Sequence, residues 1–258
     1  MNKGTKEGTE QEIAFTKILN QKNNLELWRR LEVDHQGHYA IRVKYQKFGA
    51  INNKKVLPKA DVFIAKGSVA LDYLKLKGYF LDEDDLEEFS LNPVSGSGIS
   101  IKRADSKKYQ IIKMSPSTFK KLFMKNMLAA GASIYCNNEK ECSKNKEILE
   151  AWCVSINEFE LYFKEKMYIE HNWFLLNIDT SILKKIKRWS NNEIARIINH
   201  DSNISDFIFY GIGNFTEPYT ATWLFVHNVL EKNHIIPFNI TTGSGRSRGV
   251  YTIVLKPK

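Results

Sequence analysis

The sequence predicts an α/β fold in the first half of the chain and α+β elements toward the C-terminus. Residues 39–48 and 99–103 alternate apolar and polar side chains with the period of a strand. Residues 9–20 and 180–200 repeat apolar side chains with the period of a helix, and residues 238–255 have the pattern of a closing hairpin. A chain of 258 residues that is 43% hydrophobic can bury a substantial core.

The N-terminal segment predicts a helix over residues 9–20, preceded by a flexible start over residues 1–8. Thr9 followed by Glu12 fits a capping box, in which the two side chains satisfy backbone N–H groups at the start of a helix. A further helical piece is expected over residues 25–31.

The rest of the first half predicts strands separated by turns and short helices. The acidic stretch 82–88 is expected to be a short helix or an exposed loop, and 69–76 is expected to be helical or extended. The expected strands are 39–48, 56–65, 99–103 and 109–114, with a turn at 49–55 and a small-residue loop at 93–98.

The second half predicts helices with a short strand between them and a hairpin at the end. No internal repeat and no clear linker separates the two halves. The expected helices are 117–130, 148–168, 180–200 and 222–233; the expected strands are 174–178, 238–242 and 250–255.

The charge balance favours a polyanionic partner. The chain has 38 Lys and Arg against 29 Asp and Glu, a net charge of +9, and neutralising phosphates with such an excess releases condensed counterions. A Lys-rich background composition is the alternative explanation. Three cysteines are too few for a disulfide scaffold, and the spacing from Cys136 to Cys142 does not suit a structural zinc site.

The compartment follows from what the sequence lacks. The first twelve residues are polar, with no apolar signal segment, and no apolar run is long enough to cross a membrane. We therefore expect a cytoplasmic protein with no membrane partner and no bound zinc.

Two strand-like segments carry the side chains of a metal-dependent hydrolase. Asp61 opens the apolar run after Pro58, and Ser100 and Lys102 alternate onto one face of the strand that follows a glycine-rich loop. A carboxylate on a rigid element holds Mg²⁺, and a nearby lysine orients water and offsets phosphate charge. Taken alone, each feature is more often a turn residue or part of a solvated strand face. The inference of a metal-dependent site therefore depends on the order of these residues along the chain.

The pair of segments resembles the catalytic hairpin of the PD-(D/E)XK nuclease superfamily, and specifically that of type II restriction endonucleases. Asp61 matches the first acid of the motif and Lys102 its lysine, whereas Ser100 stands where the second acid is common. Some restriction enzymes resemble this Ser-x-Lys form and take the second carboxylate from elsewhere. The segment 8–15 resembles the preceding helix that supplies a glutamate in such nucleases, so Glu12, or else Glu10, is implied as the missing metal ligand.

The resemblance implies a restriction-endonuclease-like domain over residues 1–258, whose mixed central sheet is flanked by helices. Its catalytic core is expected at about 8–135 and its DNA-gripping α+β elements at about 136–258. The resemblance also implies sequence-specific hydrolysis of double-stranded DNA with Mg²⁺ held by Asp61 and Glu12, water positioned by Lys102, and only a weak polar contact from Ser100. A palindromic target implies a homodimer. An acid of the stretch 82–88 is another possible source of the second carboxylate.

The C-terminal loop is the predicted DNA-reading element. Arg246 and Arg248 lie among Gly and Ser residues, which let a backbone approach DNA while the two arginines reach phosphates or guanine. The alternative is a hairpin tip whose arginines face solvent. Further predicted DNA contacts are Ser244, Arg103 and Lys113.

Two other functions compete with restriction. One is a nucleic-acid-binding protein that uses the basic surface without catalysis. The other is a DNA-repair or RNA-processing nuclease with the same core, which would nick or degrade its substrate without producing discrete fragments.

Overall fold

The computed structural model describes most of the chain and divides it into two compact units. The first unit comprises residues 1–109 and 205–235, and the second comprises 110–204 and 236–258. The predicted functional boundary near residue 135 does not coincide with this division and stays a prediction. The described residues are 3–43, 50–51, 54–55, 58–102, 109–136, 142–168, 180–213, 215–244 and 251–258.

The first unit is built on a mixed sheet whose described part has six strands. Its order is β1-β4-β6-β8-β9, with β5 also paired to β4. The pair β6–β8 is parallel and the other pairs are antiparallel, so the sheet is mixed. The strands are β1 (His38–Arg42), β4 (Val62–Lys66), β5 (Asn92–Pro93), β6 (Ile99–Ile101), β8 (Trp223–Val226) and β9 (Val229–Lys232); β2 (Ala50–Ile51) and β3 (Lys54–Lys55) form a separate pair.

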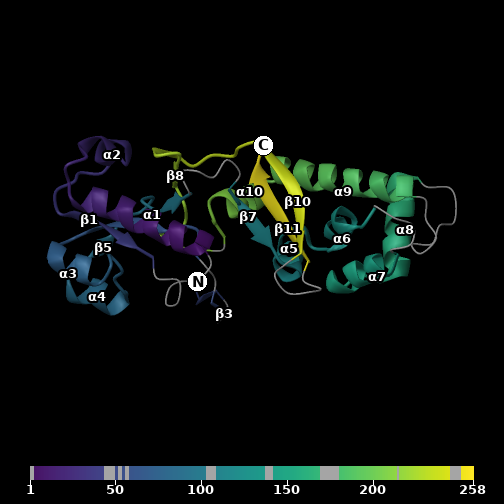
Figure 1. Cartoon of the computed structure of the whole chain (residues 1–258), viewed down its shortest axis with the longest axis horizontal. Helices are drawn as coiled ribbons and strands as arrows, with labels where there is room; N and C mark the ends of the chain where they lie inside the picture. Colours follow the sequence, from purple (N-terminus) through teal and green to yellow (C-terminus); the bar gives the residue numbers. More distant parts are fainter. Residues whose placement is uncertain are drawn as a thin grey trace. The chain divides into compact units, whose positions relative to one another are not determined.

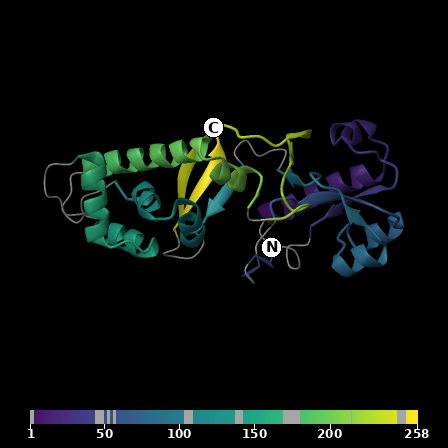
Figure 2. The ribbon, with the colours of Figure 1, turned by 180° about the vertical axis from the view of Figure 1, so that it is seen from behind.

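Helices cover both faces of this sheet. Helix α1 (Lys3–Asn20) buries Phe15 and Leu19 against one face, together with Trp28 of α2 (Leu25–Arg30). Figure 1 shows α1 in front of the strands, and Figure 2, from behind, shows the strands in front of α1. The other face packs against α3 (Leu71–Leu76) and the segment that leads into α4 (Glu83–Glu88). Two-sided burial explains why β4 is apolar at nearly every position.

The second unit combines a three-stranded antiparallel sheet with a helical layer. Its strand order is β10-β11-β7, from β10 (Phe238–Ser244), β11 (Tyr251–Pro257) and β7 (Ile112–Met114). Gly131 lets α6 approach α9 closely, because a Cβ atom there would overlap Ser190 and Phe163. The helices are α5 (Pro116–Phe123), α6 (Met127–Ser133), α7 (Cys142–Ala151), α8 (Ile156–Met167), α9 (Thr180–His200) and α10 (Ser202–Phe209), which crosses the unit boundary.

The predicted fold class is confirmed: the protein is α/β, with a mixed central sheet flanked by helices and α+β elements toward the C-terminus. Helix α9 has the predicted bounds, 180–200, and β7 ends where Ser115 caps α5 and Pro116 takes its first position. The closing hairpin is confirmed as β10–β11. No helix in the described part of the chain is both long and apolar enough to cross a membrane.

Two predicted helix boundaries in the first and middle parts are wrong. Helix α1 begins at Lys3, so residues 3–8 are helical and Thr9 lies inside the helix where it cannot be an N-cap. The predicted helix 117–130 is interrupted at Met124, whose φ of 65° is left-handed and ends α5 before α6 begins.

Two longer helices of the second half are also predicted wrongly. The stretch 148–168 is broken between α7 and α8, because Ser155 and Glu158 form a capping box that starts a new helix. The stretch 222–233 is the hairpin β8–β9, turned at His227 and Asn228 with φ of 50° and 62°. The predicted strand 174–178 lies outside the described residues.

Candidate active site

Asp61 lies just before β4, at the point where β4 and β6 separate. Its N–H donates to the Ile99 carbonyl at 2.8 Å, so its backbone still belongs to the ladder of the sheet. Two residues further along β6, the side chain replaces the backbone as the partner, because Asp61 Oδ2 accepts the Ile101 N–H at 2.6 Å. The carboxylate is thereby fixed to the rigid edge of two strands.

Ser100 joins this carboxylate to the predicted lysine. Its Oγ donates to Asp61 Oδ2 at 3.3 Å and accepts from Lys102 Nζ at 2.8 Å, and the residue is only 1% exposed. Lys102 is itself held, because its N–H donates to the Phe225 carbonyl at 2.8 Å and extends the β6–β8 ladder. The structure thus brings together Asp61, Ser100 and Lys102, although their catalytic roles stay predictions.

A second lysine, Lys59, belongs to the same electrostatic environment and was missed in the sequence. Its pKa is lowered to about 7, chiefly by burial and to a lesser extent by the positive charge of Lys102, while the negative charge of Asp61 opposes both effects. Its Nζ donates to the Ile208 carbonyl at 2.7 Å. The signal was available, since Lys59 is two residues before Asp61 and strand periodicity places such residues on one side.

Glu12, the preferred second metal ligand, is an ion-pair partner of Arg42. Arg42 Nη2 donates to Glu12 Oε2 at 2.8 Å, and the two side chains are 3% and 13% exposed respectively. Arg42 also donates to the Gly78 carbonyl at 3.3 Å and lies over the Phe80 ring, 4.0 Å from its centroid. The glutamate therefore has a structural role in joining α1 to β1, and its role as a metal ligand stays a prediction. Glu10 lies on the exposed surface of α1.

The donor chemistry around Asp61 fits one class of Mg²⁺ site. Among the residues that the structure describes, no group of three or more His, Cys, Asp and Glu is placed to hold a metal ion. Mg²⁺, however, is commonly held by one or two carboxylates together with waters and substrate phosphate oxygens. A single fixed carboxylate beside Lys102 suits that arrangement. The prediction that no zinc is bound is not tested, because the Cys142 side chain and residue 171 lie outside the described part.

The predicted DNA contacts fall mainly outside the described residues. Arg103, Arg246 and Arg248 are not described, and Ser244 is described only as the last backbone position of β10. Lys113 is an exposed residue of β7, in the second unit. DNA contact by these five residues stays a prediction.

Comparisons with known proteins give little support to any family. No family model matches the chain, and no curated protein matches it. Among solved structures, the chain is similar to the restriction endonuclease MspI in complex with its cognate DNA, at 14% sequence identity, covering 95% of this chain and 83% of that one. The TM-score is 0.33, too low for this likeness to carry any argument about the present chain.

Proposed function

We propose that this protein is an Mg²⁺-dependent endonuclease that hydrolyses phosphodiester bonds of double-stranded DNA, and more specifically a type II restriction endonuclease. The observation that carries the proposal is the hydrogen-bonded series Asp61–Ser100–Lys102 at the separation of two strands. The net charge of +9 supports a polyanionic substrate.

Each residue of the series has a distinct part in hydrolysis. Asp61, fixed by the Ile101 N–H, would hold Mg²⁺, which supplies Lewis-acid stabilisation of the phosphoryl oxygens when bound. Lys102 would orient the attacking water and offset the charge that builds on the phosphate, while Ser100 sets the position of its ammonium group. The water oxygen would form a bond to phosphorus and lose a proton to solvent as the bond from phosphorus to the 3′ oxygen breaks. The 3′ oxygen would take up a proton from solvent, so that the products carry a 5′-phosphate and a 3′-hydroxyl.

The direct test is digestion of phage DNA by the full-length protein in Mg²⁺, compared with Asp61→Asn and Lys102→Ala. We expect the wild type to cut and both variants to lose cutting. Matched controls remove the same charges elsewhere in the unit: Asp72→Asn, whose side chain is 94% exposed, and Lys66→Ala at the exposed end of β4. Cleavage that survives in both site variants would contradict the proposal.

The same digestion separates restriction from other nuclease activity. Discrete fragments from a defined phage genome indicate sequence-specific cutting, whereas a smear or nicks indicate a repair-type or RNA-processing nuclease. We also propose a homodimer, since a palindromic site matches two-fold protein symmetry. Sedimentation of the protein with a cut-site duplex measures that stoichiometry.

A nucleic-acid-binding protein without catalysis is the second candidate. The observation that favours it is the Glu12–Arg42 ion pair, which uses a predicted metal ligand to neutralise a nearly buried cation. Under this alternative the protein binds duplex DNA, and neither Mg²⁺ nor Mn²⁺ produces cleavage.

A further inference from the structure

Helix α9 of the second unit carries a row of polar and basic side chains beside its buried face. The buried face comprises Leu183, Ile186, Ser190, Ile194 and Ile198, spaced as one stripe of a helix. The adjacent stripe, one or two positions further along the helix than the buried residues, is made of Lys184, Lys187, Arg188, Asn191 and Asn192. We call these five residues the α9 stripe.

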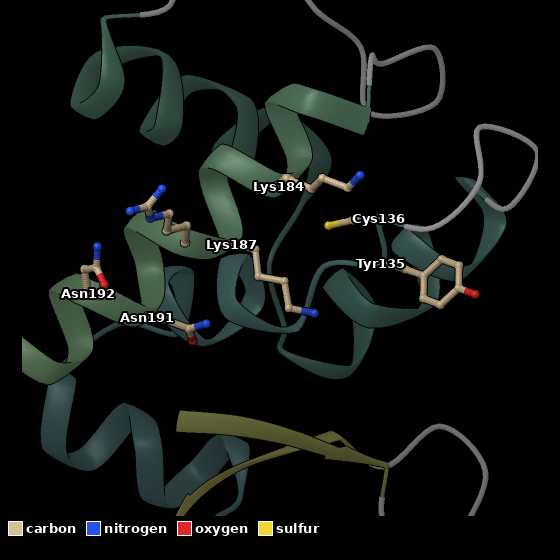
Figure 3. A pocket seen from close by; sticks show the side chains of 7 residues that line it. Tyr135, Cys136, Lys184, Lys187, Asn191 and Asn192 are labelled. Carbon is tan, nitrogen blue, oxygen red and sulfur yellow. The ribbon is translucent and has the colours of Figure 1, made fainter. Parts of the chain in front are cut away.

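The α9 stripe lines a pocket together with Tyr135 and Cys136, which follow α6. The pocket has a volume of about 540 Å³, and none of the described residues that line it is acidic. Figure 3 shows the Lys184 ammonium near Cys136 and the Lys187 side chain reaching toward the segment that follows α6. The pocket therefore presents cations and amides on one wall and an aromatic ring on the other.

Among the residues that the structure describes, no acid forms an ion pair with Lys184, Lys187 or Arg188, the cations of the α9 stripe. Glu193, which directly follows Asn192 on the same helix, is paired with Arg196 at 2.7 Å. Lys187 Nζ donates to the Ile134 carbonyl at 3.3 Å, which positions the amine at the pocket without neutralising it.

The spacing of the α9 stripe suits the backbone of a duplex more than a compact anion. Its members recur at intervals of three and four residues over two turns, and a helix rises about 5.4 Å per turn. Lys and Arg neutralise phosphates, while Asn side chains donate to phosphate or sugar oxygens; together such contacts make up most protein–DNA hydrogen bonds. An extended row of donors therefore matches successive phosphates of one strand.

We propose that the α9 stripe is a contact surface for the sugar–phosphate backbone of double-stranded DNA. The proposal rests on the proposed function, from which it takes the duplex substrate. It assigns DNA binding to a surface of the second unit that is separate in sequence from Arg246 and Arg248.

The test measures binding of a non-specific duplex of 30 base pairs by fluorescence anisotropy, in EDTA, over a series of KCl concentrations. The variant is Lys184→Ala/Arg188→Ala, and the matched control is Lys146→Ala/Lys185→Ala, which removes the same charge from exposed positions of the same unit that do not line the pocket. Both pairs are exposed, so neither should unfold the protein, and circular dichroism verifies this.

We expect the stripe variant to raise Kd about tenfold and to reduce the slope of log K against log salt by about 1 for each lost phosphate contact. The control should stay within about twofold of the wild type. Equal slopes and equal Kd values in the variant and the control overturn the proposal. Stripe-dependent binding that is tighter for single strands or for duplex RNA overturns the assignment to double-stranded DNA.

The assay separates this proposal from the proposed function because it contains no metal. Stripe-dependent binding without any Mg²⁺-dependent cutting supports DNA contact by the α9 stripe and contradicts the proposed nuclease activity. Cutting that depends on Asp61, combined with unchanged binding by the stripe variant, contradicts DNA contact by the α9 stripe and supports the proposed nuclease activity.

Discussion

The two compact units divide charge and chemistry between them very unequally. The first unit has 20 Lys and Arg against 18 Asp and Glu, a difference of +2, and the second has 18 against 11, a difference of +7; together they give the net charge of +9. Yet the fixed acid–lysine series lies in the nearly neutral unit. The proposed long-range attraction of DNA and the proposed bond cleavage thus depend on different parts of the chain.

The largest expected effect is on cleavage by the first unit. Lys102→Ala should lower the single-turnover rate about a thousandfold, because it removes a charge needed most in the transition state. Its duplex binding in EDTA should change by less than about threefold, in contrast with the stripe variant. Rapid-quench kinetics measure the cleavage rate, and fluorescence anisotropy measures duplex binding. If Lys102→Ala weakened cleavage and binding equally, the proposed separation of cleavage from binding between the two units would be contradicted.

The Glu12–Arg42 pair gives the next effect, on the stability of the first unit. Glu12→Ala should lower the free energy of unfolding by about 3–5 kcal/mol, because it leaves a nearly buried guanidinium without its acid. The double variant Glu12→Leu/Arg42→Met should recover most of that loss. Urea unfolding measures both.

The same double variant also bears on the proposed metal role of Glu12. If it is stable but inactive in Mg²⁺, Glu12 is needed for catalysis as well as for structure. If it is stable and still cuts DNA, the second carboxylate comes from another residue.

Two glycines sharpen the comparison with changes of opposite sign. Gly131→Ala should destabilise the second unit by about 1–3 kcal/mol, since its Cβ would overlap Ser190 and Phe163 between packed helices. Gly8→Ala should stabilise the first unit by up to about 1 kcal/mol, because Gly8 lies inside α1 and nothing lies within 4 Å of the added carbon. Calorimetric unfolding distinguishes the two, and equal signs would contradict the packing described.

The smallest effect concerns acid stability of the first unit. Burial alone would raise the pKa of Asp85, but hydrogen bonds from Tyr73, the Asp82 backbone and Lys77 outweigh it and lower the pKa. A lowered pKa in the folded state adds stability above the ordinary carboxyl range, and that stability is lost as the pH falls through the folded value.

The corresponding experiment compares unfolding free energies between about pH 5 and pH 2.5. Asp85→Asn should flatten the pH dependence by about 1 kcal/mol or less, since the Lys77 partner is partly exposed. Asp72→Asn is the matched control, because its carboxylate is almost fully exposed. A steeper acid dependence in the Asp85 variant would contradict the direction of the shift.

The strand-borne part of the site was predictable because it depends on local periodicity. Ser100 and Lys102 share a face through simple alternation, and Asp61 immediately precedes the apolar strand β4, which pairs with β6. The partner of Glu12 was not predictable in the same way. This pairing depends on which residue of β1 packs beneath α1 in the folded protein. No sequence pattern near Glu12 indicates that this residue is Arg42.

The errors in the predicted fold have the same origin in tertiary packing and turn chemistry. The hairpin β8–β9 turns at His227 and Asn228 without a glycine, so no strong turn signal interrupts the apolar run in the sequence. The spacing of such a short apolar run fits a helix as well as a strand. The division into two compact units was equally unpredictable from the sequence. Each unit is assembled from two separate stretches of chain, and no change of composition marks the junctions.

The parallel pairing of β6 with β8 has a consequence for the order in which the protein is made. Strand β6 ends at Ile101, and its neighbour begins only at Trp223, after the intervening stretch 110–204 of the second unit has been synthesised. Until then one edge of β6 has no partner, and the backbone bond that fixes Lys102 to Phe225 cannot form. A nascent chain therefore lacks this backbone anchor of Lys102 at first, and the proposed cutting centre is completed only after residues 223–226 have been synthesised.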